Sequence, residues 1–264
     1  MWAICNEIKG NENKEFGIQI EGDPDYAANK YNDHLLATVP KLLKYLIHVL
    51  FDWKVNANIK SIFLTPKTPD EISEIAKQLK NKHSSGYDEI LTSIVKIAIP
   101  HIQNVLCSII NNSFKYGIFP DHLKIAVIIP LYKKGNPENF DNYRPISLLP
   151  GLSKIFEKAM YSRLTTFLKQ CNIFNECEHG FLAGKSTQTA IFRYVQYILE
   201  HLKKGKIGLG MLLDLSKAYD CLDRALLMRK LEMYGARGNA GKWISPYRNC
   251  TRQHTWAALI YSIC

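Results

Sequence analysis

The sequence lacks the features that mark secreted, zinc-binding and membrane-spanning proteins. Its 7 cysteines are odd in number and no two of them have the C-x-x-C spacing, which disfavours a disulfide framework and a zinc site. The first residues, MWAICNEIKGN, do not have the pattern of a signal peptide. The apolar segment 42–51 contains Lys44 and His48, so it is too short and too polar to cross a bilayer. We therefore expect an intracellular protein, nuclear or cytoplasmic, that is neither secreted nor bound to a membrane.

Positive charge is in excess, and the excess is confined to one part of the chain. Residues 1–79 contain 9 Lys and Arg against 11 Asp and Glu, whereas residues 80–264 contain 25 against 13. A basic region of this size suggests an acidic partner, and nucleic acid is the commonest one. A basic surface that only keeps the protein in solution is the alternative, and charge alone does not separate the two.

Apolar periodicity and turn residues predict several helices. One apolar helix is expected to end near Ile99 and a separate one to begin at Pro100, because proline breaks helices; the second should end at Tyr116-Gly117. The other helices are expected at 26–51, 70–82, 151–170, 187–204 and 217–235.

Short strands are expected between these helices. The β-branched run KIAVIIPL at 124–131 reads as a strand, with Pro130 placing it at an edge or an end. Residues 143–147 look like a returning strand, so 124–147 is predicted to be a hairpin with a polar, basic tip. A further strand is expected at 207–213. Helices mixed with short strands predict the α+β class.

Three groups of polar residues are candidates for function. The sequence GKST at 184–187 resembles the end of a phosphate-binding loop, but the upstream Gly180 is too near for the full motif, so Ser186 or Thr187 is better explained as a helix N-cap. Lys133, Lys134 and Arg144 flank the hairpin; by spacing alone they are a solvated basic turn, although Arg and Lys could also clamp a triphosphate.

The third candidate is Asp214, which directly follows the apolar run 209–213. A lone aspartate there is more often a helix cap. However, Lys217, Tyr219 and Asp220 make this turn dense in polar groups, and two-metal phosphoryl transfer needs carboxylates at strand ends.

Several motifs, in one order, resemble the reverse transcriptase of non-LTR (LINE-type) retrotransposons. The hairpin region carries the RPISLL signature, and LLDLSKAYDCLD at 212–223 resembles the first palm motif. The resembling segments are 61–90 (with a K-x-x-x-G-x-D element), 119–164, 179–190, 212–223 and 230–253.

The resemblance implies the fingers and a partial palm of a right-hand polymerase, with an RNA template, a DNA primer and deoxynucleoside triphosphates as partners. Asp214 matches the first catalytic aspartate, a ligand of Mg²⁺, and the Leu215 carbonyl matches a further metal ligand. Tyr219 matches the aromatic that packs under the incoming sugar. Arg144 matches the arginine on the triphosphate, and Lys133 (or Lys134) its companion lysine. The expected division is a partly helical lead-in at 1–60, the polymerase segment at 61–253 and an aberrant tail at 254–264.

The sequence also departs from the family pattern. Glu178 stands in place of the usual Gln, Leu182 in place of Arg and Arg224 in place of His, and no two adjacent aspartates occur anywhere in the chain. Because the second catalytic motif of the family is an Asp-Asp pair, we expect a truncated domain that does not catalyse alone. A non-enzymatic nucleic-acid-binding remnant and a decayed copy without function are the alternatives.

Overall fold

The structure is a computed structural model that describes residues 23–43, 60–82, 84–180, 182–213 and 224–245. The chain divides into two compact units. One combines Met1–Leu50 with Ala126–Leu148, and the other combines Phe51–Ile125 with Leu149–Cys264. Each unit is described by itself.

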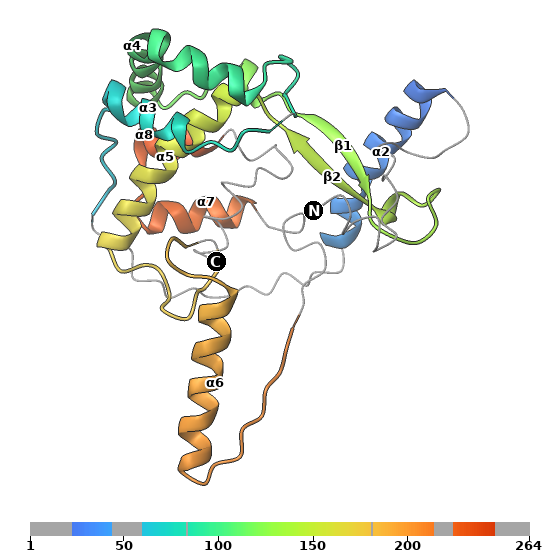
Figure 1. The fold of residues 1–264 in the computed structure, drawn as a ribbon, viewed down its shortest axis with the longest axis vertical. Coiled ribbons are helices and arrows are strands. Elements are labelled where there is room, and N and C mark those ends of the chain that lie inside the picture. Colours follow the sequence, from blue (N-terminus) through green and yellow to red (C-terminus); the bar gives the residue numbers. More distant parts are fainter. Residues whose placement is uncertain (1–22, 44–59, 83, 181, 214–223, 246–264) are drawn as a thin grey trace, which may run out of the picture. The chain divides into compact units, whose positions relative to one another are not determined.

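In the first unit the described residues form a β-hairpin with a helix packed on it (Figure 1). Strand β1 (Val127–Tyr132) pairs in antiparallel register with β2 (Tyr143–Leu148), and the register joins Tyr132 to Tyr143 and Pro130 to Pro145. This confirms the predicted hairpin. The short 3₁₀ helix η2 (Phe140–Asn142) leads into β2.

Helix α2 (Pro24–Leu43) covers one face of this hairpin. Tyr31 of α2 is buried and its ring meets those of Phe140 and Tyr143 edge-on, with centroids 5.5 and 6.2 Å apart. Side chains alternate between the faces of a strand, so Tyr143 and its partner Tyr132 mark the face that α2 covers. The predicted helix at 26–51 is confirmed as far as Leu43, and 44–51 lie outside the described residues.

The second unit is helical in the part that the structure describes, and its core brings together helices that are far apart in sequence. It contains α3 (Pro69–Lys77), α4 (Thr92–Tyr116), η1 (Asp121–Lys124), α5 (Gly151–Gln170), α6 (Thr187–Lys203), α7 (Arg224–Met233) and α8 (Gly238–Ile244). Fully buried side chains come from most of these helices and from the loop after α4; they include Trp243, Phe119, Phe156, Ile72, Ile110 and Leu164.

Trp243 joins α8 to the core. Its ring meets Phe119 and Phe114 edge-on, with centroids 5.0 and 5.8 Å apart, and its indole N–H donates to Ser113 Oγ over 2.7 Å. A buried tryptophan needs such a partner for its N–H. The sequence did not predict α8, because Gly238 and Gly241 weaken its local helix signal; burial of Trp243 offsets that weakness.

Helices α4, α5 and α6 test the helices predicted from the sequence. The predicted 151–170 and 187–204 helices are confirmed as α5 and α6. The predicted break at Pro100 is wrong, because α4 runs through it from Thr92 to Tyr116. Ile99 and Leu106, on either side of the proline, are both buried, so packing of the whole helix outweighs the loss of one backbone hydrogen bond. The left-handed Gly117 (φ 67°) ends α4 as expected.

The predicted strand at 207–213 is also wrong. These residues are extended, but among the described residues no strand pairs with them. Leu209, Leu212 and Leu213 are 94%, 96% and 82% exposed. An apolar run of this kind forms a strand only when a neighbouring strand satisfies its backbone groups, and the described part of the chain offers none.

One described helix, α4, is long and apolar enough to cross a membrane by length and composition alone. Helices from the cores of globular proteins pass the same test. Val95, Ile99, Leu106, Ile110 and Phe114 of α4 are buried in the core of the second unit, which accounts for part of the apolar composition of this helix. Its apolar residues Ile97 and Val105 are 74% and 64% exposed.

Candidate functional site

The loop that joins β1 to β2 is held in shape by its own asparagine side chains. Asn136 Oδ1 accepts from the Glu138 N–H over 2.9 Å, and Asn139 Oδ1 accepts from the Asp141 N–H over 3.0 Å. Asn142 Nδ2 donates across the loop to the Asn136 carbonyl over 2.9 Å. Such side-chain bonds replace a backbone ladder in turns, so they hold the loop of the basic tip in its shape.

Lys133 and Arg144 lie on one face of the hairpin. The Lys133 N–H donates to the Asn142 carbonyl over 2.8 Å, which extends the ladder by one rung, and Arg144 pairs with Leu131. Lys133 and Arg144 are therefore diagonal neighbours, whose Cβ atoms in a sheet lie about 7–8 Å apart or somewhat closer. Helix α2 covers the face that carries Tyr132 and Tyr143, and Lys133 and Arg144 point to the opposite face.

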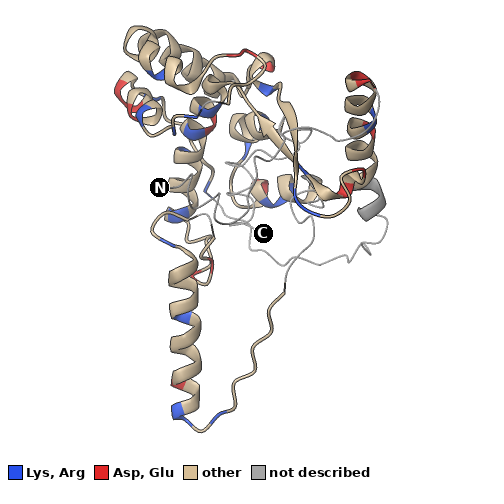
Figure 2. Cartoon of the chain, turned by 45° about the vertical axis from the view of Figure 1, so that its right-hand side comes forward, with Lys and Arg blue, Asp and Glu red and all other residues tan. Residues whose placement is uncertain are grey.

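Both cations of this pair are open to ligands. Lys133 and Arg144 are exposed, and neither forms an ion pair with a carboxylate that the structure describes. Figure 2 shows basic positions at the tip of the hairpin. Of the two lysines considered, the register favours Lys133, since the next residue, Lys134, already belongs to the turn. An ammonium and a guanidinium on one open face can hold adjacent phosphate groups.

The predicted metal ligands and the aromatic residue expected under the incoming sugar have no described position relative to the hairpin. Asp214, Leu215 and Tyr219 lie outside the described residues, so their roles stay predictions. Among the residues that are described, no group of three or more His, Cys, Asp or Glu side chains could hold a metal ion.

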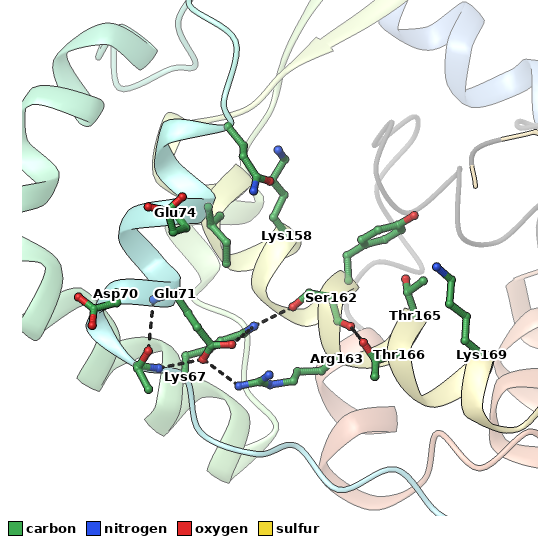
Figure 3. A pocket seen from close by; sticks show the side chains of 14 residues that line it. Lys67, Asp70, Glu71, Glu74, Lys158, Ser162, Arg163, Thr165, Thr166 and Lys169 are labelled. Atoms are coloured by element: carbon green, nitrogen blue, oxygen red, sulfur yellow. Dashed lines mark hydrogen bonds and ion pairs between the residues drawn. The ribbon is translucent and has the colours of Figure 1, made fainter. Parts of the chain in front are cut away.

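A polar network that the sequence did not predict ties α3 to α5 (Figure 3). The Lys67 ammonium, whose side chain is 3% exposed, donates to Ser162 Oγ over 2.7 Å and to Glu71 Oε1 over 3.2 Å. Arg163 Nη2 donates to Glu71 Oε2 over 2.9 Å and to the Pro66 carbonyl over 2.8 Å. Glu71 thus joins a buried lysine to an arginine from another helix.

Backbone contacts complete this network. Thr68 caps α3 in a capping box with Glu71: each side chain accepts from the other residue's N–H, over 3.2 and 3.0 Å. Asn111 of α4 accepts from the Lys67 N–H over 2.7 Å and donates to its carbonyl over 3.0 Å. The T-x-x-E spacing of Thr68 and Glu71 is a sequence signal for this cap, but the roles of Lys67 and Arg163 depend on tertiary contacts.

The ionisation of the network follows from its burial. Burial acts to raise the pKa of Glu71, but the Thr68 N–H, Lys67 and Arg163 together hold it below its ordinary value of 4.5. Burial lowers the pKa of the Lys67 ammonium, and the Arg163 charge adds to this, while Glu71 opposes it. The network therefore favours an ionised Glu71, and its hydrogen bonds are internal, which indicates a structural role.

Two sequence motifs are explained by packing in the same unit. Gly86, of the K-x-x-x-G-x-D element, lies against the chain after β2: a Cβ there would come within 2.5 Å of the Pro150 nitrogen. In the GKST segment, Ser186 caps α6 by accepting from the Thr189 N–H over 3.3 Å, which confirms the N-cap interpretation. The Lys185 ammonium donates to the Glu176 carbonyl, so it stabilises the loop between α5 and α6.

Comparison with known proteins identifies the family of the segment that begins at the end of β1. Residues 132–259 match the family described as reverse transcriptase (RNA-dependent DNA polymerase). The chain is 31% identical over 159 residues to the probable RNA-directed DNA polymerase from transposon X-element of Drosophila melanogaster, covering 60% of this chain and 17% of that protein. It is 30% identical over 161 residues to the RNA-directed DNA polymerase from mobile element jockey of the same species, covering 61% and 18%.

A further relative lies in another insect. The retrovirus-related Pol polyprotein from type-1 retrotransposable element R1 of Bradysia coprophila is 30% identical over 179 residues, which cover 67% of this chain and 17% of that protein. The chain thus spans less than a fifth of the length of these curated relatives. Together these matches show that the chain carries part of a reverse transcriptase domain of the kind found in non-LTR retrotransposons.

Proposed function

We propose that this chain supplies the nucleotide-binding hairpin and the first metal-binding aspartate of an RNA-directed DNA polymerase. In this proposal the β1–β2 hairpin belongs to the fingers, and the segment that contains Asp214 belongs to the palm. The observation that carries the proposal is the pair Lys133 and Arg144, which share an open face of an ordered hairpin and have no acidic partner among the described residues.

The chemistry required of this pair is charge neutralisation and positioning. Phosphoryl transfer to a primer 3′-oxygen builds negative charge on the triphosphate, and fixed cations that hold it in place lower the barrier. Arg144 can grip two phosphate oxygens with its planar fork, while Lys133 supplies a mobile point charge. The ordered loop keeps the lysine near the triphosphate without a large entropic cost.

We assign the remaining roles from the family resemblance. Asp214 and the Leu215 carbonyl would hold Mg²⁺, which would supply further neutralisation of the triphosphate. Tyr219 would pack under the incoming sugar and exclude a 2′-hydroxyl. RNA is the template and a DNA primer the acceptor in this proposal. Because the 264 residues contain no Asp-Asp pair, we propose that the chain by itself binds a nucleotide without incorporating it.

The direct test is the binding of a fluorescent deoxynucleoside triphosphate to the 264-residue chain. A charge-assisted hydrogen bond contributes about 1.5–3 kcal/mol, so Arg144→Gln and Lys133→Gln should each weaken binding by about tenfold or more. Arg144→Lys should recover only part of the loss, because an ammonium lacks the two-pronged geometry.

The matched control is Lys134→Gln, which removes the same charge from the adjacent residue. It should leave the affinity within about twofold of the unsubstituted chain, as expected for an exposed charge with no specific contact. Equal losses from Arg144→Gln, Lys133→Gln and Lys134→Gln would show that the hairpin is an unspecific basic turn and would overturn the proposal.

A second candidate function, a non-enzymatic nucleic-acid-binding protein, is favoured by the excess of 25 basic over 13 acidic residues in 80–264. The two functions differ in their response to the same substitutions. A protein that only binds nucleic acid should hold RNA with a steep salt dependence and should not distinguish Arg144→Gln from Lys134→Gln in binding a nucleoside triphosphate.

A further inference from the structure

Helix α5 has two faces of different character. Its core face contributes Ile155, Phe156, Ala159, Met160, Leu164 and Leu168, which are at most 2% exposed. Its other face carries a polar stripe that we define as Lys154, Lys158, Tyr161, Thr165 and Lys169. These positions follow one another at intervals of three or four residues, so they form a line along the helix about 22 Å long at 1.5 Å per residue.

The lysines of this polar stripe lie among other positive charges. Burial lowers the pKa of the Lys154 ammonium and the nearby Lys82 charge lowers it further, while Glu157 and Asp88 oppose this. Burial and then the Lys96 charge of α4 lower the pKa of Lys158. Like charges that crowd together destabilise one another unless a counter-charge is bound.

The stripe lysines have no bound counter-charge in the described chain. Neither Lys154, Lys158 nor Lys169 forms an ion pair with a described carboxylate. By contrast, the neighbouring Lys67 and Arg163 are both paired with Glu71. On α5, Arg163 thus stabilises the fold, whereas Lys154, Lys158 and Lys169 are available to a ligand.

A hollow of about 750 Å³ lies beside the stripe, between α3 and α5. Lys158, Tyr161, Thr165 and Lys169 line one side of it. In Figure 3 Lys158, Thr165 and Lys169 extend to the same side of α5, away from Arg163. The Thr165 hydroxyl is shielded from solvent and has no hydrogen-bond partner in the described structure. The α3 side of the hollow carries Asp70 and Glu74, and Glu74 is paired with Lys77.

We propose that the α5 stripe binds the phosphate backbone of a single-stranded nucleic acid. Grooves that bind single strands combine a line of cations for the backbone with an aromatic side chain for an unstacked base. The stripe has the line of cations, and Tyr161 stands between the lysines as a partly buried aromatic that also packs against the core. The proposal deepens the polymerase function proposed above and rests on it, because it assigns a surface to a nucleic-acid strand. It does not depend on Lys133 or Arg144.

The test measures binding of a short fluorescent uridine RNA to the full chain across a salt series, together with a DNA of the same length. Each phosphate contact contributes about 0.7 to the slope of log K against log salt for single strands. The triple variant Lys154→Gln/Lys158→Gln/Lys169→Gln should therefore lower the slope by about 2 for both nucleic acids, and Tyr161→Leu should weaken binding by about fivefold or more, as one stacking contact predicts.

The control is Lys203→Gln/Lys204→Gln/Lys206→Gln, which removes the same charge from exposed positions at the end of α6. This variant should keep the slope within about 0.5 of the unsubstituted value if phosphate contacts are confined to the stripe. Equal slopes for the two triple variants would assign binding to overall charge and overturn the proposal. A loss of binding by the stripe triple variant that is confined to RNA would also overturn the proposal, because phosphate contacts do not distinguish ribose from deoxyribose.

The outcome for the stripe is separable from that for the hairpin. If Arg144→Gln abolishes triphosphate binding while the stripe variant leaves RNA binding unchanged, the stripe proposal fails and the proposed function stands. Absence of salt-dependent RNA binding by the unsubstituted chain would overturn the stripe proposal. Circular dichroism of each variant checks that a loss does not come from unfolding; Lys158→Arg, which keeps the charge, should bind as the unsubstituted chain does.

Discussion

Helices α5 and α6 are of similar length, 20 and 17 residues, but they are stabilised differently. Nine residues of α5 are buried, whereas α6 has no buried residue. Figure 2 shows that α6 also carries few charges. Its apolar residues Ile191, Val195 and Leu199 are 58%, 46% and 52% exposed, although their spacing is that of a face which normally packs.

The difference shows that helical sequence signals and tertiary packing are separate contributions. In α6 the ends are specified locally: Ser186 and Thr189 form a capping box, and Gly205 follows the helix with φ 69°. In α5 no side chain caps the N-terminus, and the buried face holds the helix. Local caps fix where α6 begins, while the core fixes α5.

The strongest test of this comparison is the same substitution in both helices. Leu164 of α5 is fully buried and Leu199 of α6 is half exposed. Leu164→Ala should lower the free energy of unfolding by about 2–5 kcal/mol, because it leaves a cavity, whereas Leu199→Ala should change it by less than about 0.5 kcal/mol. Urea titrations followed by circular dichroism measure both. Equal effects would mean that α6 packs as tightly as α5.

A second test adds volume next to the N-terminus of α5. Gly86→Ala would place a Cβ within 2.5 Å of the Pro150 nitrogen and 2.7 Å of the Leu149 carbonyl carbon. Because these atoms belong to the backbone, the chain must shift, and overpacking of this kind costs about 1–3 kcal/mol. The control Gly184→Ala lies before α6 with nothing within 4 Å of its Cβ, so any loss there comes from its φ of 81° and not from a clash. Urea titration of the two variants should show the larger loss for Gly86→Ala.

The polar network between α3 and α5 gives a third test, with a pH dependence. Glu71→Gln leaves the buried Lys67 without its carboxylate and should lower the free energy of unfolding by about 2 kcal/mol at neutral pH, a value reduced for the partial exposure of Glu71. The folded pKa of Glu71 lies below 4.5. Its contribution is therefore complete above pH 4.5 and is lost as the pH falls through the folded pKa.

The measurement is a series of urea titrations from neutral to acidic pH for both proteins. The difference between the unsubstituted chain and Glu71→Gln should narrow as the solution becomes more acidic. A difference that stays constant with pH would show that Glu71 is not ionised in the network.

The smallest expected effect concerns the α6 cap. Ser186→Ala removes the acceptor for the Thr189 N–H and should destabilise α6 by about 1 kcal/mol. Because α6 buries no residue, hydrogen exchange of its own amides should report the change, while exchange in α5 stays the same. Ser186→Asp, which preserves an acceptor, should restore protection. Faster exchange in both helices would contradict the separation drawn between them.

Local patterns accounted for much of this fold. The β-branched run and the turn residues gave the hairpin, and Ser186 and Gly117 marked helix ends, because caps and turns are specified within a few residues. Pro100 and 207–213 were misread because their structure depends on distant partners: α4 is held by the core on both sides of its proline, and an extended apolar run needs a neighbouring strand. Lys67 and Arg163 were missed since their ion pairs join segments far apart in sequence.

In the candidate site, too, local sequence identified some residues, whereas their arrangement depends on tertiary structure. Lys133 and Arg144 were named from the sequence, and the register of the hairpin adds that they share a face and that α2 covers the other one. The roles of Asp214, Leu215 and Tyr219 come from resemblance to the polymerase family and stay predictions. The α5 stripe could be read as a periodic pattern only after the core face of the helix was known.

The pairing of Pro130 with Pro145 has a consequence for aggregation. In an antiparallel ladder the residues of a pair either bond to each other or turn their backbone groups outward, and two prolines can occupy only an outward-facing pair because neither has an N–H. Neither Pro130 nor Pro145 can therefore donate an amide outward at this rung. A strand that pairs beside the hairpin along either strand finds no N–H donor there, which disfavours edge-to-edge association of the hairpin that carries the basic pair.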